Sequence, residues 1–266
     1  MPERASIVVE EYLQVIFSLQ SENKAVKSIH LAQRLNTSPS TVHATLMRMR
    51  RDDLLEIAAK KEIKLTTAGL KKAEQLTRRH RLVETFLCDT LGISWHEVHK
   101  HAHILEHGLT PLVEEKLAKF LDFPVHCPHG TPIPGAGNVL PHDLVSLKEA
   151  NLGDEIEIVL IYEELEESID LMKFFQDKNI KPGIFHTVVE KNEITGTMAL
   201  QSNNSTAIIP FDIARQIGVT IKSGLFPATH ACSPRKCLAK LIKRPIMNWF
   251  ELINNVRFIL SFNPSH

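Results

Sequence analysis

The sequence contains no run of 18 apolar residues and no basic leader followed by an apolar segment. It therefore predicts neither a membrane-spanning helix nor a signal peptide. Cysteine is scarce, with only Cys88, Cys127, Cys232 and Cys237. These four are too scattered for a disulfide-rich scaffold and indicate a protein of the reducing cytoplasm. The HExxH motif of zinc hydrolases and comparable nucleophile motifs are also missing.

Net charge is likewise absent, because 31 basic residues balance 31 acidic ones, but the charges are unevenly distributed. Residues 1–80 contain 14 Lys and Arg against 9 Asp and Glu, residues 81–220 contain 10 against 21, and residues 221–266 contain 7 against 1. A basic N-terminal part favours a polyanionic partner, and an acidic central part favours bound cations. The length of 266 residues suffices for two or three domains.

The N-terminal part has the pattern of a helix-turn-helix. An apolar stripe over residues 12–19 predicts a first helix. A second, short helix is predicted over residues 28–35 with Ser28 at its N-cap. After a polar turn, Ser38 is expected to cap a third helix, with Pro39 at its first position, where no amide hydrogen bond is lost. Two helices around a short turn are typical of a DNA-reading motif.

Residues 56–65 extend this motif to a winged helix-turn-helix. They predict two short strands around a charged tip that carries Lys60 and Lys61, before a helix restarts at residues 66–69. Together with Arg48 on the third helix, these lysines are placed for contacts with DNA phosphates. Three small helices also occur in proteins that do not bind DNA, so a purely structural role is the alternative.

A second group of residues has the spacing of a metal site. Helical periodicity places residues three or four apart on one face. Imidazole and carboxylate groups that converge from a rigid helix suit a divalent first-row transition metal. A solvated helix that happens to be rich in histidine is the alternative. The seven potential ligands are His80, Glu84, His96, His99, His103, Glu106 and His107.

Six motifs follow one another over roughly residues 1–220: EEYLQVIF, TSPSTVHATLMRM, LTTAG, RRHRLVETFLCDTLGI, VHKHAHILEHGL and CPHGTPIPG. In this order and spacing the chain resembles the iron- and manganese-dependent transcriptional repressors, the family of the diphtheria toxin repressor and the manganese transport regulator. The resemblance implies a mainly α fold with small β parts. Its domains are expected to be a winged helix-turn-helix over residues 1–75, a helical metal-binding and dimerisation domain over 76–139, and an SH3-like small barrel over 140–220.

Strand patterns support the small barrel. Residues 155–161 alternate as a strand does, and residues 169–175 predict a short helix. Further strands divided by Gly and Pro turns, as in a small barrel, are expected at residues 187–190, 194–200 and 207–209.

The resemblance implies a primary, regulatory metal site formed by Glu11, His103, Glu106 and His107. Glu11 stands where iron-responsive relatives have Met and manganese-responsive ones have Asp, and His103 stands where they have Cys and Glu. The chain thus matches neither subtype, and Gln14 stands where manganese-type relatives can place a second carboxylate. Two carboxylates and two imidazoles without sulfur favour Mn(II) or Fe(II), and such a set also tolerates Zn(II), Co(II) or Ni(II).

The resemblance also implies an ancillary metal site with an anion beside it. Its helical ligands are expected to be His80, Glu84 and His99, and two oxygen ligands spaced i,i+3 are expected from the SH3-like domain. Cys127 replaces a small hydroxyl of relatives and is interpreted as a buried structural cysteine rather than a ligand. The oxygen ligands are assigned to Glu167 and Asp170, and the anion contacts to Arg81 and Thr131.

For the third helix the resemblance implies contacts with the bases of double-stranded operator DNA, read by a homodimer. Ala44 replaces a glutamine of iron-type relatives and is able to contact a thymine methyl, so the operator is expected to differ. The other contacts carry over to Ser38, Ser40, Thr41 and His43.

Residues 221–266 lie outside the resemblance. They are basic and apolar, with Pro245 interrupting a helical pattern, and His230, Cys232 and Cys237 form a weak candidate metal site. A helix that docks on a partner or a membrane surface is one alternative, and a tail that packs on its own dimer or is disordered is the other.

The function predicted for the whole chain is a metal-dependent repressor of metal-uptake genes, activated by Mn(II) or Fe(II). A metal-dependent hydrolase built on the His/Glu cluster is the alternative. Such an enzyme would need an open coordination position and a general base.

Overall fold

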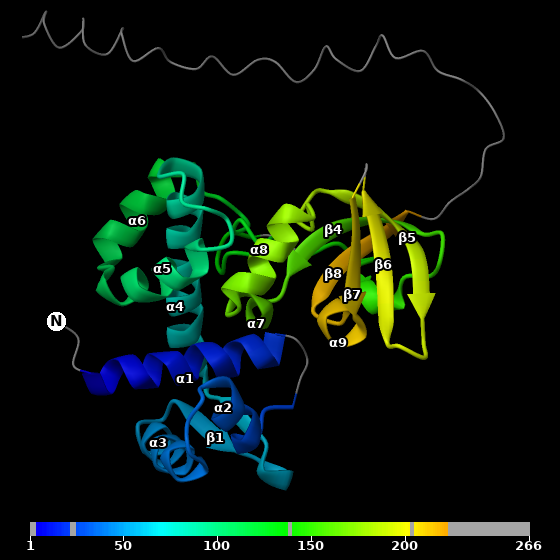
Figure 1. The fold of residues 1–266 in the computed structure, drawn as a ribbon. Helices are drawn as coiled ribbons and strands as arrows, with labels where there is room; N and C mark the ends of the chain where they lie inside the picture. Colours follow the sequence, from blue (N-terminus) through cyan, green and yellow to red (C-terminus); the bar gives the residue numbers. More distant parts are fainter. Residues whose placement is uncertain (1–3, 22–24, 138–139, 203–204, 223–266) are drawn as a thin grey trace, which may run out of the picture. The chain divides into compact units, whose positions relative to one another are not determined.

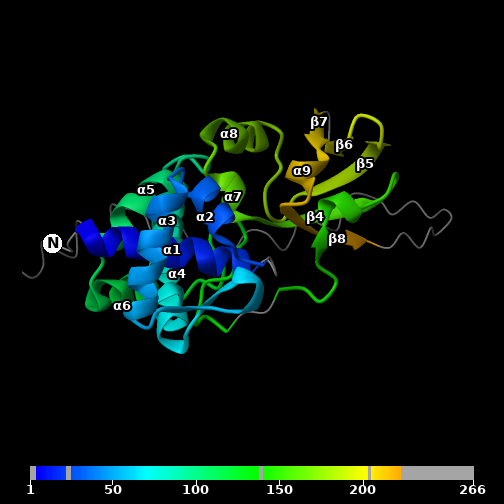
Figure 2. The ribbon, with the colours of Figure 1, turned by 90° about the horizontal axis from the view of Figure 1, so that it is seen from below.

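The structure, a computed structural model, describes residues 4–21, 25–137, 140–202 and 205–222 (Figures 1 and 2). The predictions for His230, Cys232 and Cys237 fall outside the described residues. None of the described helices has the length and apolar character needed to cross a bilayer. The described chain combines an α-helical N-terminal and central part with an antiparallel sheet, which confirms the predicted fold class.

The N-terminal part contains helices α1 (Arg4–Ser21), α2 (Ser28–Arg34) and α3 (Pro39–Arg51). Ser38 caps α3 as predicted, because its hydroxyl accepts a hydrogen bond from the Thr41 amide at 3.2 Å. The prediction of Ser28 as an N-cap is wrong. Lys27 holds that position because its carbonyl accepts from the His30 amide at 3.0 Å, which makes Ser28 the first residue of α2.

The wing is present as strands β1 (Leu55–Ile57) and β2 (Ile63–Leu65), which pair antiparallel. The short 3-10 turn Ala59–Lys61 forms its tip, where Lys60 and Lys61 have positive φ values of 59° and 61°. Apolar residues from α1, α2, α3 and both strands share one core, which fixes the wing beside α3. Its fully buried members include Leu13, Ile16, Leu31, Met49, Leu55 and Ile63.

The central part is built on the long helix α4 (Thr67–Thr85), which contacts α1, α5 (Val98–Leu105) and α6 (Pro111–Phe120). A short π-helix (Phe86–Thr90) follows α4, and a 3-10 turn (Glu106–Gly108) follows α5. The Thr66 hydroxyl caps α4 by accepting from the Gly69 amide at 3.1 Å. Figure 1 shows α1 crossing α4, so the first helix joins the DNA-reading part to the central helices.

The C-terminal part is a six-stranded antiparallel sheet in the order β3-β8-β4-β5-β6-β7, which confirms the predicted strand-rich region. The last strand reaches Lys222, two residues beyond the expected limit. Buried residues of this sheet and of helix α8 form a second core, which Trp95 joins. The elements are β3 (Val145–Ser146), the 3-10 turn Leu147–Glu149, β4 (Glu155–Ile161), α7 (Glu163–Glu166), α8 (Ile169–Asp177), β5 (Phe185–Asn192), β6 (Thr197–Ser202), β7 (Ser205–Pro210), α9 (Phe211–Ala214) and β8 (Ile217–Lys222).

Replacement of Gly69 by alanine is expected to lower the free energy of unfolding by roughly 2–3 kcal/mol, because overpacking a core costs energy of this order. A Cβ at Gly69 would lie 1.8 Å from the Leu54 carbonyl oxygen, so α4 would have to move away from the wing. Gly108→Ala is the matched control, since its Cβ would meet nothing within 4 Å. Urea denaturation measures both, and equal losses for the two variants would contradict this packing.

Candidate metal centre and DNA-binding surface

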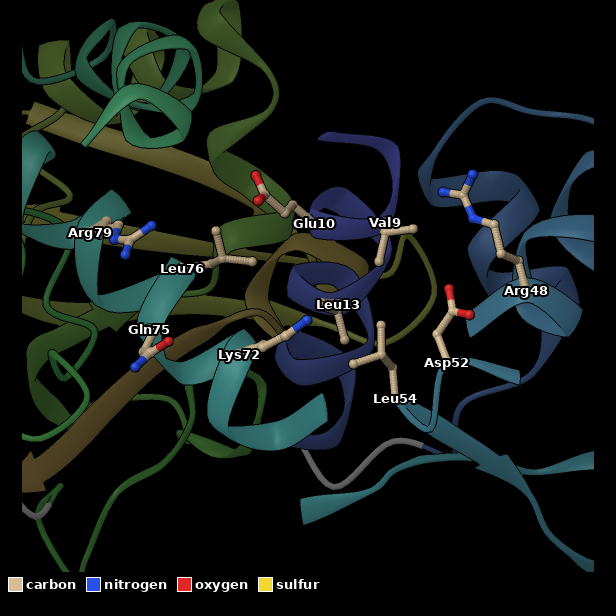
Figure 3. A pocket seen from close by; sticks show the side chains of 10 residues that line it. All are labelled: Val9, Glu10, Leu13, Arg48, Asp52, Leu54, Lys72, Gln75, Leu76 and Arg79. Carbon is tan, nitrogen blue, oxygen red and sulfur yellow. The ribbon is translucent and has the colours of Figure 1, made fainter. Parts of the chain in front are cut away.

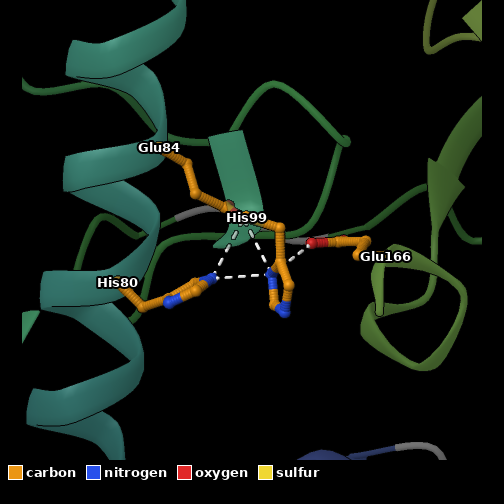
Figure 4. Close-up of side chains that lie close together, drawn as sticks. All are labelled: His80, Glu84, His99 and Glu166. Atoms are coloured by element: carbon orange, nitrogen blue, oxygen red, sulfur yellow. Dashed lines mark hydrogen bonds and ion pairs between the residues drawn. The ribbon is translucent and has the colours of Figure 1, made fainter. Parts of the chain in front are cut away.

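Helix α4 places His80 and Glu84 one turn apart, and α5 and α7 bring His99 and Glu166 against them (Figure 4). The His80 Nε2 atom lies 3.0 Å from Glu84 Oε1 and 3.0 Å from His99 Nδ1. His99 Nδ1 lies 3.0 Å from Glu166 Oε2. All four side chains are buried, and one ligand atom from each lies within 4.8 Å of the others. We call these four residues the α4–α7 cluster.

The loop at residues 126–132 adds Cys127 and His129 to this cluster. His129 Nδ1 lies 3.1 Å from Glu166 Oε2 and 3.5 Å from Glu84 Oε1. This Nδ1 atom makes no hydrogen bond of adequate geometry with the described residues although the ring is fully buried, whereas Nε2 lies 3.1 Å from the Trp95 carbonyl oxygen. The ligand atoms of Glu84, Cys127 and His129 also lie within 4.8 Å of one another. A buried nitrogen aimed at two carboxylates, with a thiol beside it, fits a divalent metal that accepts N, O and S ligands.

Sequence reasoning did not name Glu166 or His129, and the structure does not place Glu167 and Asp170, the two residues assigned from the sheet domain, among the clustered ligand atoms. Glu167 is 62% exposed at its side chain and approaches His99 Nε2 only to 4.0 Å. Asp170 is exposed on the first turn of α8. The expected i,i+3 pair fails because α7 ends at Glu166, so Glu167 and Asp170 share no helix face. The Cys-x-His spacing at residues 127–129 is the signal that would have indicated His129.

The four residues expected in the primary site also lie close together. Glu106 is fully buried, with its Oε1 atom 3.4 Å from His103 Nδ1 and 3.5 Å from His107 Nε2. Glu11 lies at the edge, where its Oε1 atom is 3.9 Å from His103 Nε2. We call these four residues the α1–α5 cluster. Their role as metal ligands stays a prediction.

Two further side chains of α1 contact this cluster. Glu10 Oε2 lies 2.6 Å from His107 Nδ1. The Gln14 amide donates to Glu106 Oε1 at 3.0 Å. Gln14, which stands where manganese-type relatives can place a second carboxylate, therefore holds the central carboxylate of the cluster by a hydrogen bond.

His80 connects the two clusters. Its Nδ1 atom lies 2.5 Å from Glu106 Oε2, while its Nε2 atom contacts Glu84 of the α4–α7 cluster. His80, His103 and Glu106 also bring ligand atoms within 4.8 Å of one another. One imidazole ring thus touches both candidate sites, so its protonation or ligation affects both.

Mutual pairing shifts the pKa values of these groups strongly. Burial opposes charge on His99, but hydrogen bonds to Glu166 and Glu84 outweigh it and raise the pKa of His99 to about 9. Burial also works against ionised Glu106, but the charge of His80 and hydrogen bonds from His103 and His80 lower its pKa to about 2. Without metal, imidazolium–carboxylate pairs therefore hold the side chains of both clusters together.

The expected anion site at Arg81 and Thr131 contains a carboxylate of the chain itself. Arg81 Nη1 donates to the Pro132 carbonyl at 2.5 Å, and its Nη2 atom lies 3.5 Å from Glu163 Oε2. Thr131 Oγ1 lies 3.0 Å from Cys127 Sγ. Arg81 and Thr131 line a shared cavity of about 500 Å³, so they are close enough for one ligand, although Glu163 already compensates the guanidinium.

The candidate DNA contacts of α3 lie on its outer side. A groove of about 500 Å³ runs between the start of α3 and the wing, lined by Pro39, His43 and Lys61 among others. Residues of α3, the candidate recognition helix, and of the wing therefore line one continuous surface. The exposed candidates are Ser38, Ser40, Thr41, His43, Ala44, Lys60 and Lys61.

Arg48 lies differently from the other candidates, because it is only half exposed and lines a cavity of about 530 Å³ between α1, α3 and α4 (Figure 3). Acidic Glu10 and Asp52 line the same cavity, as do basic Lys72 and Arg79. The charges are of both signs and come from α1, α4 and the C-terminal end of α3. Contact between Arg48 and a DNA phosphate stays a prediction.

Comparison with known proteins places this geometry in a family. Residues 6–63 match the model of the iron dependent repressor, N-terminal DNA binding domain, and residues 66–135 match that of the iron dependent repressor, metal binding and dimerisation domain. The iron-dependent repressor IdeR of Mycobacterium leprae is 32% identical over an alignment of 220 residues that covers 79% of this chain and 95% of IdeR. The chain belongs to the iron-dependent repressor family.

Other relatives agree with this membership. The diphtheria toxin repressor of Corynebacterium diphtheriae is 30% identical over 218 residues, covering 79% of this chain and 95% of that protein. A manganese-dependent transcriptional repressor solved in complex with manganese superposes with a TM-score of 0.71 at 29% identity, over 80% of this chain and all of that one. ScaR with bound Zn²⁺ superposes with a TM-score of 0.68 at 27% identity, over 79% and 98%.

Membership in the iron-dependent repressor family makes the chain a metal-dependent DNA-binding regulator, as the sequence predicts. The repressors of this family are DNA-binding proteins, and the alternative of a metal-dependent hydrolase finds no support in these comparisons.

Metal binding is expected to release at least one proton at pH 7, because a histidine must be neutral to bind a metal and the pKa of His99 is raised to about 9. The free protein binds more protons than the loaded one, so metal affinity rises with pH up to about 9. Calorimetric titration with Zn(II) in two buffers of different protonation enthalpy counts the protons.

The matched control for proton release is His101→Gln, which changes an exposed histidine of the same helix and leaves the count unchanged. Zero proton release by the wild-type protein at pH 7 would contradict the metal centre.

Proposed function

We propose that this chain is a homodimeric repressor of metal-uptake genes, activated by Mn(II) or Fe(II) and acting in the cytoplasm. The observation that carries the proposal is the contact of two candidate ligands, in the turn that follows α5, with α1 of the DNA-binding part. His107 pairs with Glu10, and Glu106 accepts from Gln14. Side chains that hold a metal at Glu106 therefore also fix the first helix of the winged helix-turn-helix.

The α1–α5 cluster is proposed as the regulatory site. Its residues offer two carboxylates and two imidazoles, a set that suits Mn(II) and Fe(II) and also accepts Zn(II), Co(II) or Ni(II). Bound metal would supply positive charge among carboxylates that otherwise depend on protonated histidines. The chain's residues then hold α1 against α5, which favours the state that binds DNA only if metal binds that state more tightly.

The α4–α7 cluster, extended by Cys127 and His129, is proposed as a second metal site. In it Glu166 takes the role that was assigned to Glu167 and Asp170, and Cys127 is proposed as a ligand rather than a structural thiol. The mixed set of imidazole, carboxylate and thiolate favours Zn(II) or Fe(II) over Mn(II), because Mn(II) prefers oxygen ligands.

A dimer surface is proposed on α5 and α6, within the part of the chain that matches the family's metal binding and dimerisation domain. Large apolar side chains are exposed there although they lie on ordered helices. They are Ile104, Leu105, Leu112, Val113 and Phe120, with exposures of 66%, 47%, 63%, 51% and 65%. The proposed division of the chain remains 1–75, 76–139 and 140–220, with residues 221–266 as a tail.

Glu106→Gln is expected to reduce the metal-dependent gain in DNA affinity at least tenfold, because the central carboxylate of the α1–α5 cluster is lost. The DNA probe is a double-stranded fragment that the protein selects from a random pool in Mn(II). Glu193→Gln, which neutralises an exposed carboxylate of the sheet part, serves as control. Wild-type binding that is equally tight with Mn(II) and with a chelator would refute the proposal.

Replacing both Lys60 and Lys61 by alanine is expected to weaken binding to selected and scrambled DNA alike and to reduce the slope of log affinity against log salt by about 2. Both lysines are exposed at the wing tip, where phosphates contribute affinity without sequence information. Lys173→Ala on α8 is the control, since it removes an exposed charge far along the chain. If affinity fell only for the selected fragment, the wing would be contacting the bases rather than the phosphates.

A further inference from the structure

Helix α7 is only four residues long, yet its three carboxylates reach three different parts of the chain. Glu163 pairs with Arg81 of α4 at 3.5 Å, and Glu164 pairs with Arg34 of α2 at 3.2 Å. Glu166 lies 3.0 Å from His99 and 3.1 Å from His129 in the α4–α7 cluster. A single turn of helix therefore contacts a candidate metal centre and the helix-turn-helix at once.

The Arg34–Glu164 contact lies in a largely buried setting. The Arg34 side chain is 11% exposed, and its Nε atom has no hydrogen-bond partner among the described residues. A buried guanidinium needs a nearby anion, and Glu164, at 38% exposure, supplies it. Arg34 is the last residue of α2. Because α2 packs against α3, a shift of Arg34 changes the packing of α3, the helix proposed to read DNA.

Space beside the ion pair permits a second arrangement. A cavity of about 630 Å³ lies along α2 and α7, lined by Arg34 and Glu164 together with Lys27 and His30. Lys27 at the N-cap of α2 and His30 within α2 thus line the same cavity as Glu164 of α7. The cavity leaves space beside the ion pair, as a contact with two alternative arrangements requires.

We propose that α7 couples the α4–α7 cluster to the DNA-reading motif and that Arg34 and Glu164 are its positioning residues. The inference rests on the proposed metal site at that cluster. Ligation of metal by Glu166 fixes α7, which holds Glu164 against Arg34 and so fixes α2 beside α3. By linkage, closing the Arg34–Glu164 pair raises metal affinity by the same factor by which metal favours the closed pair.

The test compares Glu164→Gln, Arg34→Gln and the double variant with the wild type, using Zn(II) as the metal and the selected DNA fragment described above. Each single change is expected to lower the zinc-dependent gain in DNA affinity about three- to tenfold, the range of a partly buried ion pair. The double variant is expected to lose no more than the worse single, because both changes remove one interaction. In the presence of a chelator, the DNA affinity of each variant is expected to stay within about twofold of the wild-type value.

Hydrogen exchange gives a readout that does not depend on DNA. In the wild type, Zn(II) is expected to slow amide exchange in α4 and α5 and also in α2. In Glu164→Gln the slowing persists in α4 and α5 but is lost in α2. Glu149→Gln, which removes an exposed carboxylate of the same sheet part, retains both effects.

The outcomes separate the two proposals. Absence of any zinc effect on α4 and α5 in the wild type would refute the metal site itself. Slowing of α4 and α5 with no change in α2 of the wild type would overturn the coupling alone. Additive losses in the double variant, or equal losses with zinc and with chelator, would also overturn it, because they would reduce Arg34 and Glu164 to independent structural roles.

Discussion

Three carboxylates removed from water are the constraint on which the rest of this structure depends. Glu84, Glu106 and Glu166 are 1%, 0% and 3% exposed and come from three separate segments. A buried carboxylate is costly unless a cation or several donors compensate it. The compensating groups are histidines of α4, α5 and the loop before residue 130, so these segments are held together by charge pairing as well as by apolar packing.

Because the same imidazoles are good metal ligands, a metal is able to replace protons without moving the carboxylates far. His80 makes this exchange cooperative in principle, since its two ring nitrogens contact Glu106 and Glu84 in different clusters. Occupation of one cluster changes the charge that the other must balance. The clusters also reach the DNA-binding part by separate routes, through Glu10 and Gln14 on α1 and through Glu164 on α7.

Local patterns in the sequence sufficed for the helix-turn-helix, the wing and the helical positions of His80, Glu84 and His99, because each depends on spacing within one element. The local patterns failed for residues whose position depends on the path of the chain between elements. The register of α7 is set by its end at Glu166, which no periodicity marks. His129 reaches the cluster because Gly130, at φ 87°, lets its loop approach the Val159 carbonyl, where a Cβ would lie 2.1 Å from the oxygen. The Cys-x-His spacing marks His129 as a candidate ligand, but it does not show that this loop reaches the cluster.

The two clusters differ in the chemistry they ask of a metal. In the α4–α7 cluster the Cys127 thiol has its pKa raised by burial and by the charge of Glu84, so its proton leaves only for a metal with strong affinity for sulfur. The α1–α5 cluster contains no sulfur and includes Glu11, which is one-third exposed. A tight site for a thiophilic metal would remain filled while metal levels change. The more open oxygen- and nitrogen-rich α1–α5 cluster is therefore the one proposed to exchange its metal with solution, which is the property that a sensor requires.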